Sequence, residues 1–119
     1  MPVVWTKGVR AGLLSENQFV ETVSTKAAKI FNMFPRKGII RSGSDADIVI
    51  WDPNFKKTIT ARNQIQKVDS NIFEGLEVYG KSLITFSNGK IVWRDDKFLN
   101  QKQGKYIKRP PFGFVYGRH

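Results

Sequence analysis

The residues in this chain that could do chemistry are few, and the most suggestive are Asp45 and Asp47, just before an apolar run. A close pair of carboxylates can bind a hard metal ion or act as general acid and base. Either use needs convergent partners, and the sequence has no cysteine and only one histidine, at its last position. Aspartate also accepts backbone hydrogen bonds at turns, and the adjoining Gly43-Ser44 is typical of a turn. We therefore interpret both aspartates as turn-capping residues.

The remaining candidates have structural explanations as well. Asp95-Asp96 follows a strand-like run and is interpreted as a turn, and Arg36-Lys37 could bind an anion but is typical of solvated linker charge. Ser15 and Ser24-Thr25 suit helix capping, and no base is available to activate them as nucleophiles. We predict no catalytic, substrate-binding or metal-ligating residue in this chain.

Composition excludes several classes of protein. The 119 residues contain no cysteine, which rules out disulfides, thiolate zinc sites and cysteine nucleophiles. With 40% hydrophobic and 25% charged residues the balance is that of a globular domain. No apolar run is long enough to span a membrane, and no signal-peptide pattern opens the chain. The net charge of +10 would suit a nucleic-acid-binding module, but the basic residues come in ones and twos, so we interpret them as solvated or partner-facing charge.

The first third of the sequence predicts helices. Residues 1–9 are typical of the end of a helix, which Gly12 terminates. Ser15 and Gln18 form the S-x-x-Q pattern of a capping box, so a helix should begin there. Ser24-Thr25 indicates a second cap, which predicts a separate short helix over residues 26–31 that ends before Pro35.

From Gly38 onward the pattern becomes strand-like. The first long strand should stop at Asp52-Pro53, and residues 61–70 should form a loop. Asn88-Gly89 predicts a two-residue hairpin turn, because both residues tolerate positive φ, and Asp95-Asp96 should end that hairpin. The strands are expected at residues 39–40, 48–51, 58–60, 76–79, 83–86 and 91–93.

The tail from Gly104 has no helical or strand period, yet it carries four aromatic residues. They are Tyr106, Phe112, Phe114 and Tyr116. Burying a large apolar side chain gains about 1.5–3 kcal/mol. We therefore expect the tail to dock against another surface.

Five ordered segments resemble the C-terminal part of one family. They are Glu16-to-Gly38, Gly43-to-Pro53, Asn71-to-Gly75, Gly89-to-Val92 and Pro111-to-Tyr116. Together they are similar to the dihydropyrimidinase, hydantoinase and collapsin response mediator group of the amidohydrolase superfamily. The resemblance covers nearly the whole chain. The chain departs from the family pattern at residues 63–66, which lack the usual histidines, at Arg41-Ser42 and in the order of Lys108-to-Pro111.

The resemblance implies that the chain is a fragment with an α+β fold. Two or three short N-terminal helices would end a TIM-type barrel, antiparallel strands of a small β-sandwich would follow, and an extended tail would come last. The corresponding parts are residues 1–37 for the barrel-associated helices, 38–100 for half of the sandwich, and 101–119 for an inter-subunit tail.

The resemblance also implies the activity of the parent protein, a cytoplasmic cyclic amidohydrolase of pyrimidine catabolism that opens 5,6-dihydropyrimidine or hydantoin rings. Its two-zinc centre activates a hydroxide, and its ligands have no counterpart in these 119 residues. The fragment should therefore bind no zinc and be inactive alone. Its expected partners are the rest of the parent chain and the neighbouring subunits of a homotetramer, with neither a membrane nor nucleic acid.

Two alternatives stay open from the sequence. The parent could be a non-enzymatic scaffold, because the collapsin response mediator proteins keep nearly the same C-terminal segments. A stand-alone basic module that binds nucleic acid is the more remote alternative. Under the fragment interpretation the strands lack partners, so we expect the isolated chain to self-associate or to be poorly ordered.

Overall fold

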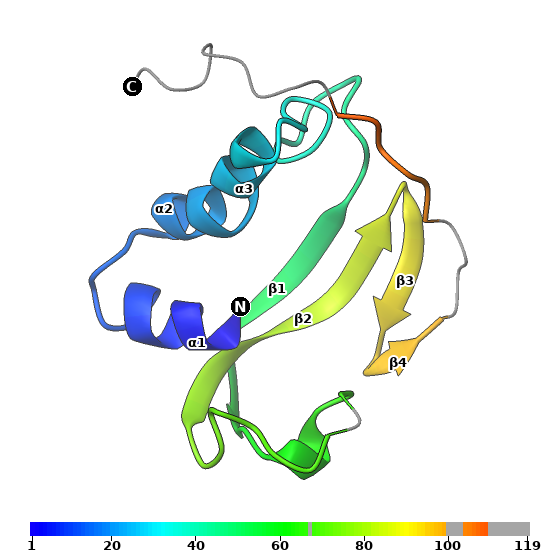
Figure 1. The fold of residues 1–119 in the computed structure, drawn as a ribbon. Coiled ribbons are helices and arrows are strands. Elements are labelled where there is room, and N and C mark those ends of the chain that lie inside the picture. Colours follow the sequence, from blue (N-terminus) through cyan, green and yellow to red (C-terminus); the bar gives the residue numbers. More distant parts are fainter. Residues whose placement is uncertain (67, 100–103, 110–119) are drawn as a thin grey trace.

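A computed structural model describes residues 1–66, 68–99 and 104–109 of the chain. Helical segments come first and a four-stranded antiparallel sheet follows, with the strands in the order β1-β2-β3-β4 (Figure 1). The α+β class and the order of elements expected from the sequence are confirmed.

The first helical segment consists of α1 (Pro2–Val4) and a π-helical turn, η1 (Trp5–Val9). Pro2 suits the first turn of a helix, where its missing N–H has no intrahelical partner to lose. The chain leaves the helical region at Gly12, whose φ is +74°, as the sequence predicts.

The second helical segment runs without a break through α2 (Glu16–Val20), η2 (Glu21–Thr25) and α3 (Lys26–Ile30). Its capping box is confirmed: the backbone N–H of Gln18 donates to Ser15 Oγ at 3.2 Å, and Ser15 N–H donates to Gln18 Oε1 at 2.8 Å. The predicted second cap at Ser24-Thr25 is wrong. Thr25 has helical φ and ψ of −65° and −47°, and its hydroxyl donates to the carbonyl oxygen of Gly38 at 2.7 Å.

Strand β1 (Ile48–Thr58) continues past Asp52-Pro53, so the predicted stop is wrong. β1 is an edge strand, where a proline can be tolerated because its missing N–H can face away from the neighbour. The pairing with β2 shifts register between Ile50 and Trp51 and again between Asp52 and Lys56. These irregularities let the strand pass the proline without ending.

Strand β2 (Glu77–Ser87) joins two predicted strands into one, and Gly80, at φ +94°, lies inside it. Asn88 and Gly89, at φ +48° and +78°, make the predicted hairpin turn to β3 (Lys90–Arg94). Asp95-Asp96 makes a second turn, at φ +51° and +60°, into the short β4 (Lys97–Phe98).

Two other strand predictions change. Residues 39–40 form no strand, and residues 58–60 contribute only Thr58, the last residue of β1. The predicted loop contains the short 3-10 helix η3 (Ala61–Asn63).

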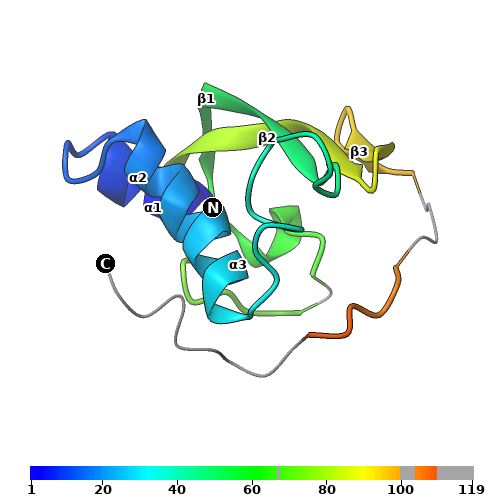
Figure 2. The same cartoon turned by 90° about the horizontal axis from the view of Figure 1, so that it is seen from above.

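The helices and the segment between β1 and β2 lie on one side of the sheet (Figure 2). Three aromatic rings join these layers: the centroid of Trp5 lies 5.1 Å from that of Phe19 and 6.1 Å from that of Trp51. Among the described residues the buried apolar side chains are Trp5, Phe19, Ala28, Ile59 and Val78. The core that these residues form is small.

The opposite face of the sheet is apolar too. Its residues include the pair Ile50 and Ile84, and Ile50 is 44% exposed. No described element covers this face in Figure 2. The described residues contain one sheet, so the second layer of a sandwich and the boundaries at 37 and 100 stay predictions. Most of the predicted tail, residues 101–103 and 110–119, lies outside the described residues.

Candidate functional site

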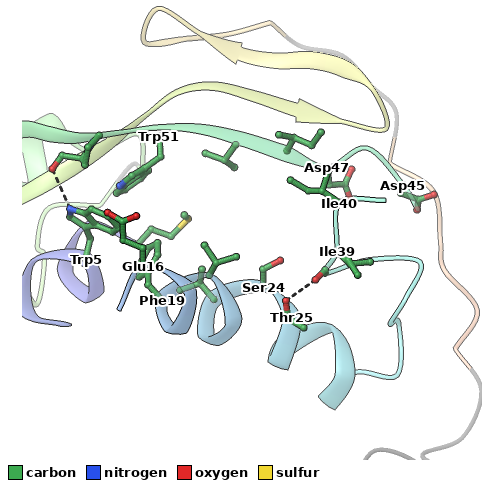
Figure 3. Close-up of a pocket in the computed structure, with 17 residues that line it drawn as sticks. Trp5, Glu16, Phe19, Ser24, Thr25, Ile39, Ile40, Asp45, Asp47 and Trp51 are labelled. Carbon is green, nitrogen blue, oxygen red and sulfur yellow. Dashed lines mark hydrogen bonds between the residues drawn. The ribbon is translucent and has the colours of Figure 1, made fainter. Parts of the chain in front are cut away.

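A cavity of about 690 Å³ separates the second helical segment from β1. Phe19 and Val23 line it from the helical side, and Val49 and Trp51 from the strand (Figure 3). We call the segment between α3 and β1 the linker. Asp45 and Asp47 lie at the end of the cavity where the linker enters β1. The walls suit an apolar group, and the acidic residues stand at the edge.

The structure brings the basic pair Arg36-Lys37 of the linker into contact with the acidic pair Asp45 and Asp47. Asp45 Oδ2 lies 2.9 Å from Arg36 Nε and 3.0 Å from Lys37 Nζ, and Lys37 Nζ also contacts Asp47 Oδ2. We call Arg36, Lys37, Asp45 and Asp47 the linker cluster. Its two cations and two anions neutralise each other, which disfavours both a free anion site and a free carboxylate pair.

The charges of the linker cluster shift two pKa values. Hydrogen bonds from Lys37 and then Arg36 lower the pKa of Asp45, because they favour the carboxylate. Partial burial disfavours the charged form of Lys37, but its hydrogen bonds to Asp47 and Asp45 outweigh that effect and raise its pKa. Both groups therefore hold their charges more firmly than they would in water.

The linker cluster also holds the β2–β3 turn. Asp47 Oδ1 accepts the backbone N–H of Asn88 at 2.8 Å, and the Ala46 carbonyl accepts that of Gly89 at 3.0 Å. Asp47 thus caps a turn, as the turn-capping interpretation predicts, although the turn is 41 residues further along the chain. This arrangement positions backbone and does not present a reactive group.

A second cavity, of about 680 Å³, opens beside the first on the helix-side face of the sheet. Met1, Val49 and Trp51 line both cavities, and Trp93 lines the second. The indole Nε1 atoms of Trp51 and Trp93 are buried and have no hydrogen-bond partner within the described part of the chain. The sequence places both residues in strand-like runs and so indicates ordinary core residues, with no signal for these unpaired donors.

Of the other candidates from the sequence, Ser24 and Thr25 line the first cavity and Asp96 lines the second. Asp96 pairs with Lys81 at 2.5 Å and Asp95 with Arg94 at 3.4 Å, next to the second hairpin turn. Among residues 1–66, 68–99 and 104–109, no three His, Cys, Asp or Glu side chains gather in a way that could hold a metal ion. In the same ranges no helix combines the length and apolar character that crossing a membrane requires.

A sequence profile described as "Amidohydrolase family" matches residues 4–92, about three quarters of the chain. The chain belongs to the amidohydrolase family. The matched range includes the first helical segment from Val4 onward, the whole second helical segment, β1, β2 and the turn that the linker cluster holds.

Relatives of this amidohydrolase segment carry dihydropyrimidinase names. The chain is 50% identical to a dihydropyrimidinase of Rattus norvegicus over 120 aligned positions, which cover 99% of the chain and 23% of the relative. It is 46% identical to dihydropyrimidinase-related protein 5 of Mus musculus over 99 positions, covering 83% and 18%. The chain therefore spans about a quarter or less of the length of these relatives.

Solved structures show the same relation. A D-hydantoinase from Bacillus sp. AR9 is 52% identical with a TM-score of 0.87, over 91% of this chain and 24% of that one. A second D-hydantoinase is 42% identical with a TM-score of 0.89, over 94% and 25%. The fold of this amidohydrolase segment is thus the fold of the matching quarter of hydantoinases.

Proposed function

We propose that the chain is the C-terminal part of a dihydropyrimidinase-type enzyme, and that the complete protein hydrolyses the cyclic amide bond of 5,6-dihydropyrimidines or hydantoins. The observation that carries the proposal is the 50% identity to a dihydropyrimidinase over 99% of the chain. The likeness to D-hydantoinases at 52% identity supports the same reaction class. The physiological role proposed for the complete protein is pyrimidine catabolism in the cytoplasm.

The proposed reaction requires zinc in the complete enzyme, but the residues of this chain do not fit a zinc centre. Such a centre needs nitrogen, sulfur or oxygen ligands that converge from several elements. The chain has no cysteine and one histidine. The carboxylates of the linker cluster already form ion pairs with Arg36 and Lys37 and accept a hydrogen bond from the backbone of Asn88. We therefore assign the two-zinc centre to the rest of the enzyme and derive no catalytic step through this chain.

The role that we propose for the chain is architectural. Residues 1–37 would complete the barrel, residues 38–100 would form one half of a small sandwich, and residues 101–119 would reach a neighbouring subunit of a homotetramer. The uncovered apolar face of the sheet, with Ile50 44% exposed, supports a second layer from elsewhere. Arg109 Nη1 donates to the carbonyl of Phe31 at 3.3 Å, so the last described part of the tail touches the end of α3.

The test is an activity assay on two proteins. We expect the product of the surrounding coding sequence, expressed whole, to hydrolyse dihydrouracil or hydantoin and to lose that activity after chelation of zinc. We expect the 119-residue chain alone to show no turnover. Turnover by the chain alone would refute the architectural role, and a whole product inert toward both rings would refute the proposed reaction.

A second candidate is a non-enzymatic scaffold. The observation in its favour is the 46% identity to a dihydropyrimidinase-related protein over 83% of the chain. This alternative predicts a whole product that assembles into oligomers and hydrolyses neither substrate. The assay above separates the two candidates.

A further inference from the structure

The turn between β2 and β3 contains a chemically labile pair of residues. Asn88 is the only asparagine in the chain that is followed by glycine. In such a pair the backbone nitrogen of the glycine can attack the side-chain amide of the asparagine, because glycine has no side chain in the way and a permissive backbone. Asn88 and Gly89 are both exposed, so water reaches the turn. The turn therefore carries the groups that spontaneous deamidation needs.

The reaction needs no enzyme and no reactant other than water. The Gly89 nitrogen forms a bond to Cγ of Asn88, the bond from Cγ to the amide nitrogen breaks, and ammonia leaves with the proton of the Gly89 N–H. Water then opens the cyclic succinimide at either carbonyl. The products are aspartate, or isoaspartate with the backbone rerouted through the side chain. In both products a neutral amide has become a carboxylate.

Two hydrogen bonds from the linker oppose this reaction. The Gly89 N–H, which must lose its proton, donates to the carbonyl oxygen of Ala46 at 3.0 Å. The Asn88 N–H donates to Asp47 Oδ1 at 2.8 Å, and Lys37 holds the other oxygen of that carboxylate. The two bonds fix the backbone on both sides of the Asn88 Cα. Ring closure therefore requires the turn to leave the linker first.

We propose that Asn88 is a deamidation site whose rate is set by the linker cluster: slow while Asp47 and the Ala46 carbonyl hold the turn, and fast once they release it. A carboxylate at position 88 adds a negative charge beside Asp47, and like charges repel. Isoaspartate also lengthens a two-residue turn that sets the register of β2 and β3. The linker holds either product less firmly than it holds Asn88. The modification is irreversible, so its extent rises with the age of the protein.

The competing interpretation of Asn88-Gly89 is a turn with a structural role alone, because this pair is common in two-residue hairpins. Deamidation at such a turn would not respond to the removal of a side chain 41 residues away. The dependence of the rate on Asp47 thus separates the two interpretations.

The experiment follows one tryptic peptide of the whole product of the coding sequence over several weeks at physiological temperature and pH. Cleavage after Lys81 and Lys90 releases residues 82–90, in which Asn88 is the only asparagine. Mass spectrometry measures the conversion of amide to carboxylate, and chromatography separates aspartate from isoaspartate. The same protein in urea gives the rate of an open turn. We expect Asn88 to react roughly tenfold more slowly in the native protein, because two hydrogen bonds of ordinary strength must break.

Three variants locate the control at the linker cluster. Asp47→Ala removes the acceptor of the Asn88 N–H and should raise the native rate about fivefold. Asp47→Asn keeps an oxygen acceptor but loses the charge, so its rate should lie between. Asp69→Ala removes the same charge from the exposed segment before β2 and should match the unchanged protein. Equal rates for Asp47→Ala and the unchanged protein would overturn the proposal. So would a native rate equal to that in urea, or no reaction in either.

Hydrogen exchange separates a released turn from an unfolded chain. The Gly89 N–H should exchange faster in both Asp47 variants. The N–H of Tyr79, which donates to Thr6 Oγ1 at 2.8 Å, should keep its protection. Where Asp47→Ala does not fold, Asp47→Asn decides by the same comparison. Loss of folding in both variants would overturn the proposal, because a contact that only gates one turn leaves the rest of the sheet folded.

Discussion

At the residue scale, Gly80 determines how closely β2 approaches the aromatic rings. Its φ is +94°, and a Cβ there would touch Trp51 Cζ2, lie 2.8 Å from Trp51 Cε2 and lie 3.1 Å from Trp5 Cδ1. We predict that Gly80→Ala lowers the free energy of unfolding by about 2–4 kcal/mol, from backbone strain and overpacking together. Urea denaturation measures the change. The matched control is Gly43→Ala, at φ +89° with no atom within 4 Å, which should cost only the strain, about 1–2 kcal/mol. Equal losses would contradict the close packing at Gly80.

The lowered pKa of Asp45 predicts that the stability of the fold depends on pH. Its pKa is lowered in the folded chain from the ordinary value of 3.8, by hydrogen bonds from Lys37 and then Arg36. A depressed folded pKa stabilises the fold at pH values above 3.8, and that contribution disappears as the pH falls through the folded pKa. Asp45→Asn should therefore reduce the urea midpoint at pH 6 but change it little at pH 2. Asp69→Asn, on the exposed segment before β2, is the control and should change the urea midpoint little. A midpoint loss for Asp45→Asn that is equal at both pH values would argue against the ionic contribution.

At the element scale, the second helical segment depends on one cap. Ser15 makes both bonds of the capping box with Gln18, whereas Ser24 lies exposed inside the continuous helix. We predict that Ser15→Ala costs about 1 kcal/mol of stability. Ser24→Ala should be neutral or slightly stabilising, because alanine favours helix interiors. Thermal unfolding followed by circular dichroism measures both changes. A larger loss of stability for Ser24→Ala than for Ser15→Ala would support the separate second helix that the sequence predicts.

The elements also show which local signals decide structure in this chain. The capping box at Ser15 and the Asn88-Gly89 turn could be predicted because each depends on neighbours within three residues. The predicted stop at Asp52-Pro53 was wrong because β1 lies at the sheet edge, where a proline is tolerated. The sequence predicts two strands where the structure has one continuous β2, and the positive φ of Gly80 between them serves the packing of Trp5 and Trp51. The edge position of β1 and the close packing at Gly80 depend on tertiary structure, which a local sequence pattern does not reveal.

At the scale of the whole molecule, the candidate site could be predicted only in part. The scarcity of histidine and cysteine is visible in the sequence and predicts that zinc ligands lie elsewhere. The linker cluster is not predictable from local pattern, because its ion pairs join residues 9 and 10 positions apart. The bond by which Asp47 holds Asn88 joins residues 41 positions apart. The unpaired indoles of Trp51 and Trp93 were also missed, since an aromatic residue in a strand-like run indicates core burial whether or not its N–H finds an acceptor.

The uncovered face of the sheet predicts how the isolated chain behaves in solution. Ile50 is 44% exposed there and lies beside Ile84 and Phe86, so a second apolar surface that covers it would gain hydrophobic free energy. We predict that the average mass in sedimentation equilibrium rises with concentration, and that Ile50→Thr raises the concentration needed about tenfold, while threonine keeps the strand. Ile72→Thr, at a position 92% exposed in the segment before β2, is the control and should change nothing. A chain that stays monomeric and melts cooperatively at every concentration would show that this face is stable in water without a partner.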